Sequence, residues 1–224
     1  MSMLLLGLSI ISLSFLAFAM NESSATQKTI DQIDIDNALE NVFVSAVANM
    51  LDTGDLQIRE RHPIGRANTL YTFRAVASEE ALKLDVLRAP EADVEAAMET
   101  YFRDDDTRKI LRDAIRSART QIGNHAEVFE RLRHSKSLSR SSWWCFSRHF
   151  TYFQPPNRIR RVNSERSPRG EMFSILVSVR HEGRNVRALD AVILLTGRED
   201  EPFWVYRWEK YSGAEAGSCP NETH

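Results

Sequence analysis

The sequence predicts an α+β protein: a long N-terminal helix, then short helices, and finally an antiparallel sheet. Residues 8–53 contain no proline and no glycine, so one helix can run through the whole stretch. The last third contains three strand-like segments joined by a hairpin and a turn. The 224 residues, 42% hydrophobic and 27% charged, have an average globular composition and the length for a sizeable core. This composition excludes a disordered tail, a collagen and a polytopic membrane protein.

The first segment, residues 1–20, carries no charged side chain and fits two interpretations. As a signal peptide it would be cleaved after Ala17-Phe18-Ala19, which matches a small-x-small site. As a membrane anchor it has about the 20 apolar residues that a spanning helix needs. Both interpretations place the rest of the chain outside the cytoplasm.

The next segment, residues 21–53, is amphipathic and continues the helix to a stop at Gly54. Apolar residues recur at spacings of three and four, which places them on one face of a helix. We expect this face to bundle with other helices in an assembly, through Ile30, Ile33, Leu39, Val42, Phe43, Ala46, Val47 and Met50; Leu51 follows in the same pattern.

The middle of the chain predicts alternating short elements. We expect a turn at 63–65, strands at 69–77 and 81–87, and a helix that begins at Pro90. A second helix should be capped by Asp106, and a third should span 126–132. Residues 133–142 should form a loop and 146–153 a strand.

The last third predicts an antiparallel meander. Strands are expected at 173–180, 186–196 and 203–208, with a hairpin at 182–185 and a turn at 197–202.

Catalytic and metal-binding motifs are not evident in the sequence. There is no glycine-rich phosphate loop, nucleophile elbow or Cys-x-x-Cys pair, and the six histidines are scattered. The run Asp104-Asp105-Asp106 could bind a hard cation such as calcium, but it lacks a clear ligand set and also suits a helix cap. We expect no enzyme activity, no catalytic residue, no metal ligand and no cofactor; a hydrolase that uses His149 or His181 is a remote alternative.

Charge is distributed unevenly along the chain. Residues 21–60 carry eight acidic and two basic side chains, whereas residues 131–170 carry ten basic and one acidic. Such blocks indicate solvated or binding faces. The second block gives a candidate basic interaction face formed by Arg140, Arg148, Arg158, Arg160 and Arg161. Aromatic residues interleave with it, as in single-strand nucleic-acid binders, but a compartment outside the cytoplasm favours a protein or lipid partner.

The two cysteines, Cys145 and Cys219, suit an oxidising compartment. They could form one disulfide that closes a loop of about 75 residues and contributes about 4 kcal/mol to stability. The alternative is one buried and one free thiol.

Several short motifs, taken in order, resemble the general secretion pathway protein K family, the large minor pseudopilin of type II secretion systems. ALENVFVSAVANML at 38–51 resembles the end of its long helix, and EALKLDVLRAP at 80–90 resembles its acidic residue and Lys-hydrophobic-Asp strand. RDAI at 112–115 and FTYF at 150–153 resemble its insertion helix and the following strand. FSILVSV at 173–179, RALDAVILL at 187–195 and PFWVYRW at 202–208 resemble its closing strands.

The resemblance implies a pilin-like fold, with the N-terminal helix laid on an antiparallel sheet and a helical insertion between strands. The implied domains are an apolar transmembrane segment at 1–20, its amphipathic continuation at 21–53, and a flexible tail at 212–224. A pilin-like α+β domain would comprise 54–87 and 146–211, and the inserted helical subdomain 88–145.

The resemblance also implies the function of an assembly component at the tip of a periplasmic pseudopilus. Such a subunit would sit in the inner membrane by a single span, with its bulk in the periplasm. Its partners would be other minor pseudopilins and the inner-membrane secretion platform, and it would bind no nucleic acid. The alternative from the residues is a secreted or periplasmic adaptor with a cleaved signal peptide and a basic binding face.

Overall fold

The computed structural model describes residues 2–64, 69–121, 125–153, 171–196, 198, 200–216 and 219, and the side chains of helix α1 from Thr26 onward except Gln27. The helices are α1 (Ser2–Thr53), η1 (Glu80–Leu82, a 3-10 turn), α2 (Glu91–Tyr101), α3 (Asp105–Thr120), α4 (His125–His134) and α5 (Arg140–His149). The strands are β1 (Gln57–Ile64), β2 (Thr69–Glu79), β3 (Leu84–Asp85), β4 (Phe150–Thr151), β5 (Met172–His181), β6 (Arg184–Leu195) and β7 (Phe203–Ser212).

Five strands form one antiparallel sheet in the order β1-β2-β5-β6-β7. The two short strands, β3 and β4, pair separately and in parallel. Helices α2 to α5 lie between β3 and β4 in the chain. Because these two strands pair, the chain enters and leaves the helical region at neighbouring points. The predicted α+β class with an antiparallel sheet is confirmed.

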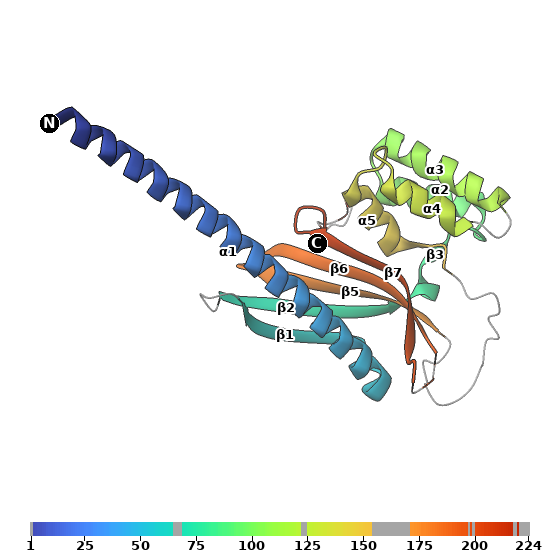
Figure 1. Cartoon of the computed structure of the whole chain (residues 1–224). Coiled ribbons are helices and arrows are strands. Elements are labelled where there is room, and N and C mark those ends of the chain that lie inside the picture. The colour runs from blue at the N-terminus through green and yellow to red at the C-terminus, as the bar shows by residue number, and fades with distance from the viewer. Residues whose placement is uncertain are drawn as a thin grey trace.

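Helix α1 lies along one face of the sheet, and its N-terminal part projects beyond the sheet edge (Figure 1). The helix ends where the sequence predicts. Gly54 follows with a φ of 73°, a left-handed conformation that glycine adopts readily, and its amide donates to the carbonyl of Met50 at 3.1 Å.

The sheet separates two apolar cores, because successive residues of a strand point to opposite faces. Leu189 and Ala191 of β6 point to the core shared with α1. Ala188 of β6 and Tyr211 of β7 belong to the core shared with the helical region. The sheet therefore connects the long helix on one side to α2–α5 on the other.

Strand β1 differs from the prediction of a turn at 63–65. Pro63 and Ile64 lie in this strand, opposite Leu70 and Thr69 of β2. The proline is tolerated because β1 is an edge strand, where a missing N–H interrupts no ladder on the outer side. The strand contains charged residues, including Arg59 and Glu60, and therefore lacks the alternation of apolar and polar residues by which a strand is predicted from sequence.

The segment predicted as a strand at 81–87 is a 3-10 turn followed by the two residues of β3. The cap of α3 also lies two residues earlier than expected. Asp104, not Asp106, accepts a hydrogen bond from the amide of Thr107 at 2.8 Å, and the helix starts at Asp105.

The predicted loop at 133–142 is confirmed only for residues 135–139, and the predicted strand at 146–153 is wrong over most of its length. Helix α4 continues to His134, and α5 begins at Arg140 with Ser139 as its cap. Only Phe150 and Thr151 form strand β4. The aromatic residues satisfy helical spacing as well as strand alternation, and burial on several sides stabilises the helix.

Candidate functional site

The predicted bundling face of α1 is occupied mainly by the chain's own sheet. Of the eight residues assigned to it, six are buried in the core between α1 and the sheet: Leu39, Val42, Phe43, Ala46, Val47 and Met50. Only Ile30 and Ile33 are exposed, by 42% and 54%. The prediction is therefore corrected: most of this stripe stabilises the subunit and is not free to contact another helix.

A second apolar stripe of α1 faces solvent. Val44 is 57% exposed, and Leu51, which the periodicity assigns to the packed face, is also exposed. Ile33, Val44 and Leu51 are eleven and seven residues apart, close to whole turns of an α-helix, so they share one side. The sequence reasoning missed Val44 because the stronger stripe beside it dominates the pattern.

Three ion pairs hold α1 beside strands β6 and β7. The guanidinium of Arg187 on β6 donates to both carboxylate oxygens of Asp36 at 2.9 and 3.1 Å. On β7, the ammonium of Lys210 lies 2.8 Å from Glu40 and 3.7 Å from Asp36. The bidentate geometry orients α1 as well as attracting it.

Strand β7 exposes apolar side chains along its first half. Trp204, Val205, Tyr206 and Trp208 are each between 37% and 48% exposed. The ring of Phe43 of α1 packs edge-on against Trp208 at 4.9 Å and against Phe203 at 6.0 Å, so two aromatic contacts join α1 to β7. The exposed apolar surface of the described chain thus includes the outer side of α1 and the outer strand beside it.

A buried polar cluster joins the helical region to the sheet. Lys83 of the segment after η1 donates to Glu80 at 2.6 Å, to the carbonyl of Ser147 in α5 at 2.7 Å, and to the hydroxyl of Ser174 in β5 at 2.5 Å. Ser174 in turn donates to Glu80. All three ammonium protons therefore have acceptors, which a buried charge requires.

The same cluster continues through β6 and β7. Ser147 donates to Asp190 at 3.1 Å, and Arg207 donates to the same carboxylate oxygen at 2.6 Å. Glu209 accepts hydrogen bonds from Trp143 of α5 at 3.0 Å and from Tyr211. These contacts fix the helical region in one position against the sheet, because each buried group needs its partner.

The environment of this cluster shifts the pKa values of its members. Burial alone would raise the pKa of Glu80, but the charge of Lys83 and hydrogen bonds from Lys83, Ser174 and Thr151 lower it below its ordinary value of 4.5. Burial, together with the charges of Asp190 and Glu209, raises the pKa of Tyr211. Glu80 is thus held ionised at neutral pH as a structural partner of Lys83.

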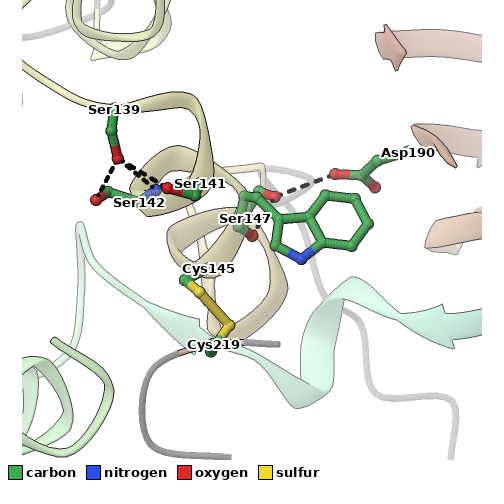
Figure 2. The surroundings of a disulfide bond; sticks show 8 residues. Ser139, Ser141, Ser142, Cys145, Ser147, Asp190 and Cys219 are labelled. Carbon is green, nitrogen blue, oxygen red and sulfur yellow. Dashed lines mark hydrogen bonds between the residues drawn. A yellow bond between two sulfur atoms is a disulfide. The ribbon is translucent and has the colours of Figure 1, made fainter. Parts of the chain in front are cut away.

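The structure joins Cys145 and Cys219 in a disulfide, with their Cα atoms 5.4 Å apart. Figure 2 shows the bond between α5 and the chain near its C-terminus, with Ser147 and Asp190 in its surroundings. Both cysteines are buried in the core around the helical region. The bond thus fastens the chain after β7 to the helices.

The predicted basic interaction face is only partly described. Arg140 lies 3.2 Å from Glu215 and donates to the carbonyl of Lys210 at 2.8 Å, while Arg148 lies over the ring of Trp144. Arg158, Arg160 and Arg161 lie outside the described residues. Arg140 and Arg148 thus contact the chain's own groups.

The aromatic residues between these arginines do not form an open stacking surface. Trp143, Trp144, Phe146, Phe150 and Tyr152 are all buried in the core around the helices. The rings of Phe129, Phe146 and Phe150 stack with centroids 5.2 to 5.7 Å apart. This cluster therefore serves as the core of the helical region.

The other candidate groups for chemistry are separated from one another. His149 stacks on Tyr101 with ring centroids 3.7 Å apart, and His181 lies against Tyr71 near the hairpin. Of the run at 104–106, Asp104 caps α3 and Asp105 pairs with Arg108. No group of three or more metal-ligating side chains occurs in the part of the chain that the structure describes.

Across the described residues, no helix carries a stretch long and apolar enough to cross a membrane. The side chains of residues 1–20 lie outside that part of the structure. In comparisons with known proteins, the chain matches no family model, no curated protein and no solved structure.

Proposed function

We propose that the protein is a minor pseudopilin of a type II secretion system, which assembles at the tip of the periplasmic pseudopilus and supports export of folded proteins. The ordered series of motifs from 38 to 208 supports this proposal. So does the arrangement of the elements, which is the one expected of a pilin-like fold: a long helix on one face of an antiparallel sheet, with helices inserted between strands.

The observation that carries the proposal is the division of α1 into a packed half and a projecting half. Packing against the sheet begins at Ile35 and continues to Met50, whereas the helix starts at Ser2. The preceding residues include the uncharged segment 1–20. Helix α1 is thus a rod that is apolar at one end and is fixed at the other end to a folded head, which comprises the sheet and helices α2–α5. This arrangement suits a subunit that is held in a membrane before assembly.

The subunit would act through contacts and not through chemistry. In the proposed assembly, neighbouring helices cover the projecting half of α1. The exposed stripe of Ile33, Val44 and Leu51 extends the available apolar surface along the head. The ion pairs of Asp36 with Arg187 and of Glu40 with Lys210 would keep the head in a fixed orientation relative to the rod.

The membrane is the first test of this function. We expect the protein recovered from cell membranes to retain residues 8–20 by intact mass and N-terminal sequencing, and to resist extraction by high salt. A chain that is found only in the soluble periplasm and begins at Met20 would overturn the proposal, and would support the adaptor interpretation instead.

Secretion is the second test. Deletion of the gene should stop export of the organism's type II substrates, and the full chain should restore it. A variant with Val44→Asp should restore export less well than one with Leu82→Asp, because both replace exposed apolar residues but only Val44 lies on the proposed assembly side of α1. Equal restoration by both variants would contradict the assigned surface.

A further inference from the structure

The two edges of the sheet differ in how they are protected against pairing. The outer strand β1 carries Arg59, Glu60, Arg61 and Pro63, which are residue types that discourage addition of another strand. The opposite outer strand, β7, exposes aromatic and aliphatic side chains between Phe203 and Trp208. An edge with unpaired backbone groups and apolar side chains is a template for a further strand.

The hydrogen bonds at the two ends of β7 show which of its backbone groups face outward. The amide of Gly213 donates to Val186 at 2.9 Å, and the carbonyl of Pro202 accepts from Thr196 at 3.0 Å. Along an antiparallel strand, residues whose N–H and C=O groups point toward β6 alternate with residues whose groups point to the outer side. The register shifts at Tyr206, the extra residue opposite Val192 and Ile193. The outward-facing groups are therefore those of Phe203, Val205, Trp208, Lys210 and Ser212.

The C-terminal half of this edge is already occupied within the chain. Arg140 of α5 donates to the outward carbonyl of Lys210 at 2.8 Å, and the outward amide of Ser212 donates to Glu215 at 2.8 Å. No strand of the described residues pairs with the other half of the edge, from Phe203 to Trp208. The open section thus coincides with the exposed apolar section.

We propose that the outer edge of β7 from Phe203 to Trp208 accepts an extended segment of a partner chain as a sixth strand. The segment would be apolar on both of its faces, because Val205 and Trp208 project on the α1 side of β7 while Trp204 projects on the other. A basic residue of the segment would lie beside Asp200 and Glu201, two exposed carboxylates just before β7 that share one cation, Arg198, among the described residues.

Antiparallel pairing with β7 of a second copy does not fit the edge, and this step rests on the proposed function. Between Asp36 and Phe43, α1 passes from Lys210 to Trp208 and Phe203, so it runs opposite to β7. Antiparallel pairing of two β7 strands would point the two α1 helices in opposite directions, and both could not enter the same membrane. A lipid surface does not fit either, because the N-terminus of α1 lies beyond the Lys210 end of the strand.

The test is site-specific photo-crosslinking in cells, with benzoylphenylalanine in place of Trp204. The probe is combined with Val205→Pro, which removes one outward N–H without touching the ladder to β6, or with Val205→Ala, which shortens the side chain and keeps the N–H. The same probe in place of the exposed Leu70 on β2 serves as the control position.

We expect the Trp204 probe to capture an extended segment of another protein, identified by mass spectrometry. Val205→Pro should reduce the adduct at least tenfold and Val205→Ala less than threefold, and the Leu70 probe should not capture that segment. A Val205→Pro chain that unfolds at the same urea concentration as the parent shows that the fold is intact. If it unfolds earlier, a purified chain with an N-methylated backbone at Val205, made by semisynthesis, replaces the proline variant and is crosslinked in vitro to the partner captured in cells.

Three outcomes would overturn the proposal: an adduct with a second copy or with lipid, an adduct that is insensitive to loss of the Val205 N–H, or no adduct. The proposed function is judged separately by a probe in place of Val44. A Val44 adduct with another pseudopilin, without a Trp204 adduct, would reject the sixth strand and retain the assembly function.

Discussion

At the scale of single residues, two charged side chains of one short motif form a buried ion pair at the junction of the helical region and the sheet. Glu80 and Lys83 belong to the segment that resembles the pseudopilin family, and their side chains are 2% and 8% exposed. Removing one partner of a buried pair leaves the other charge uncompensated, which usually costs more than the pair itself contributes.

Glu80→Gln should therefore destabilise the protein by about 3–5 kcal/mol. The measurement is urea unfolding at pH 7, followed by tryptophan fluorescence. Glu99→Gln, at an exposed position of α2, is the matched control and should leave the midpoint unchanged. An equal effect of the two substitutions would show that the buried pair does not hold the junction.

The pH dependence of stability follows from the lowered pKa of Glu80. A carboxyl group with a lowered pKa in the fold stabilises the protein fully above its unfolded pKa of about 4.5, and this contribution is lost as the pH falls through the folded pKa. The stability difference between the parent and Glu80→Gln should thus be constant from pH 7 to about pH 5 and shrink in acid. A difference that grows toward acid would contradict the assigned charge state.

At the scale of elements, α1 is fixed to the sheet by one of its two apolar stripes. Phe43 is buried between Phe203 and Trp208, whereas the adjacent Val44 faces solvent. Phe43→Ala should lower the free energy of unfolding by about 3–5 kcal/mol, while Val44→Ala should have little effect. Chemical denaturation of the two variants tests this, and similar midpoints would mean that α1 is packed differently.

The disulfide links another pair of elements, α5 and the segment that follows β7. Replacing both Cys145 and Cys219 by serine should lower stability by about 2–4 kcal/mol, because the unfolded chain loses a closed loop. Peptide mass mapping without reduction should recover the two cysteines in one linked pair. Two unlinked thiols in the protein isolated without reductant would contradict this pairing.

Elements were predictable where one periodicity dominated. The helix up to Thr53 and the strands β5 and β6 have clear patterns, and the structure places them within a few residues of the expected bounds. The apolar residues of 146–153 fit both the 3.6-residue period of a helix and the two-residue period of a strand, so the sequence alone does not distinguish the two. In β1, charged side chains on an edge strand replace the apolar alternation that would reveal it.

The candidate surface was less predictable than the fold, for a physical reason. An apolar stripe indicates that something covers it, but it does not distinguish the chain's own sheet from another subunit. Leu39 and Met50 are covered internally, whereas Ile33 remains exposed on the same helix. Trp204 and Tyr206 were expected only as strand residues; no sequence signal shows that β7 lies at the edge.

At the scale of the whole molecule, the head should fold without the first part of α1. Packing begins at Ile35, so a chain that starts at Thr26 retains every described contact between α1 and the sheet core. Its urea midpoint should equal that of the full chain in detergent, and its circular dichroism should lose only helical signal. A lower midpoint would show that the projecting part stabilises the head.

The opposed directions of α1 and β7 also have a mechanical consequence. Tension along the axis of α1 acts nearly parallel to the interface, so the pair of Asp36 with Arg187 and the packing of Phe43 share the load. Contacts loaded together in shear yield at higher force than contacts peeled apart one after another. A force along α1 would therefore load these contacts together and not one after another.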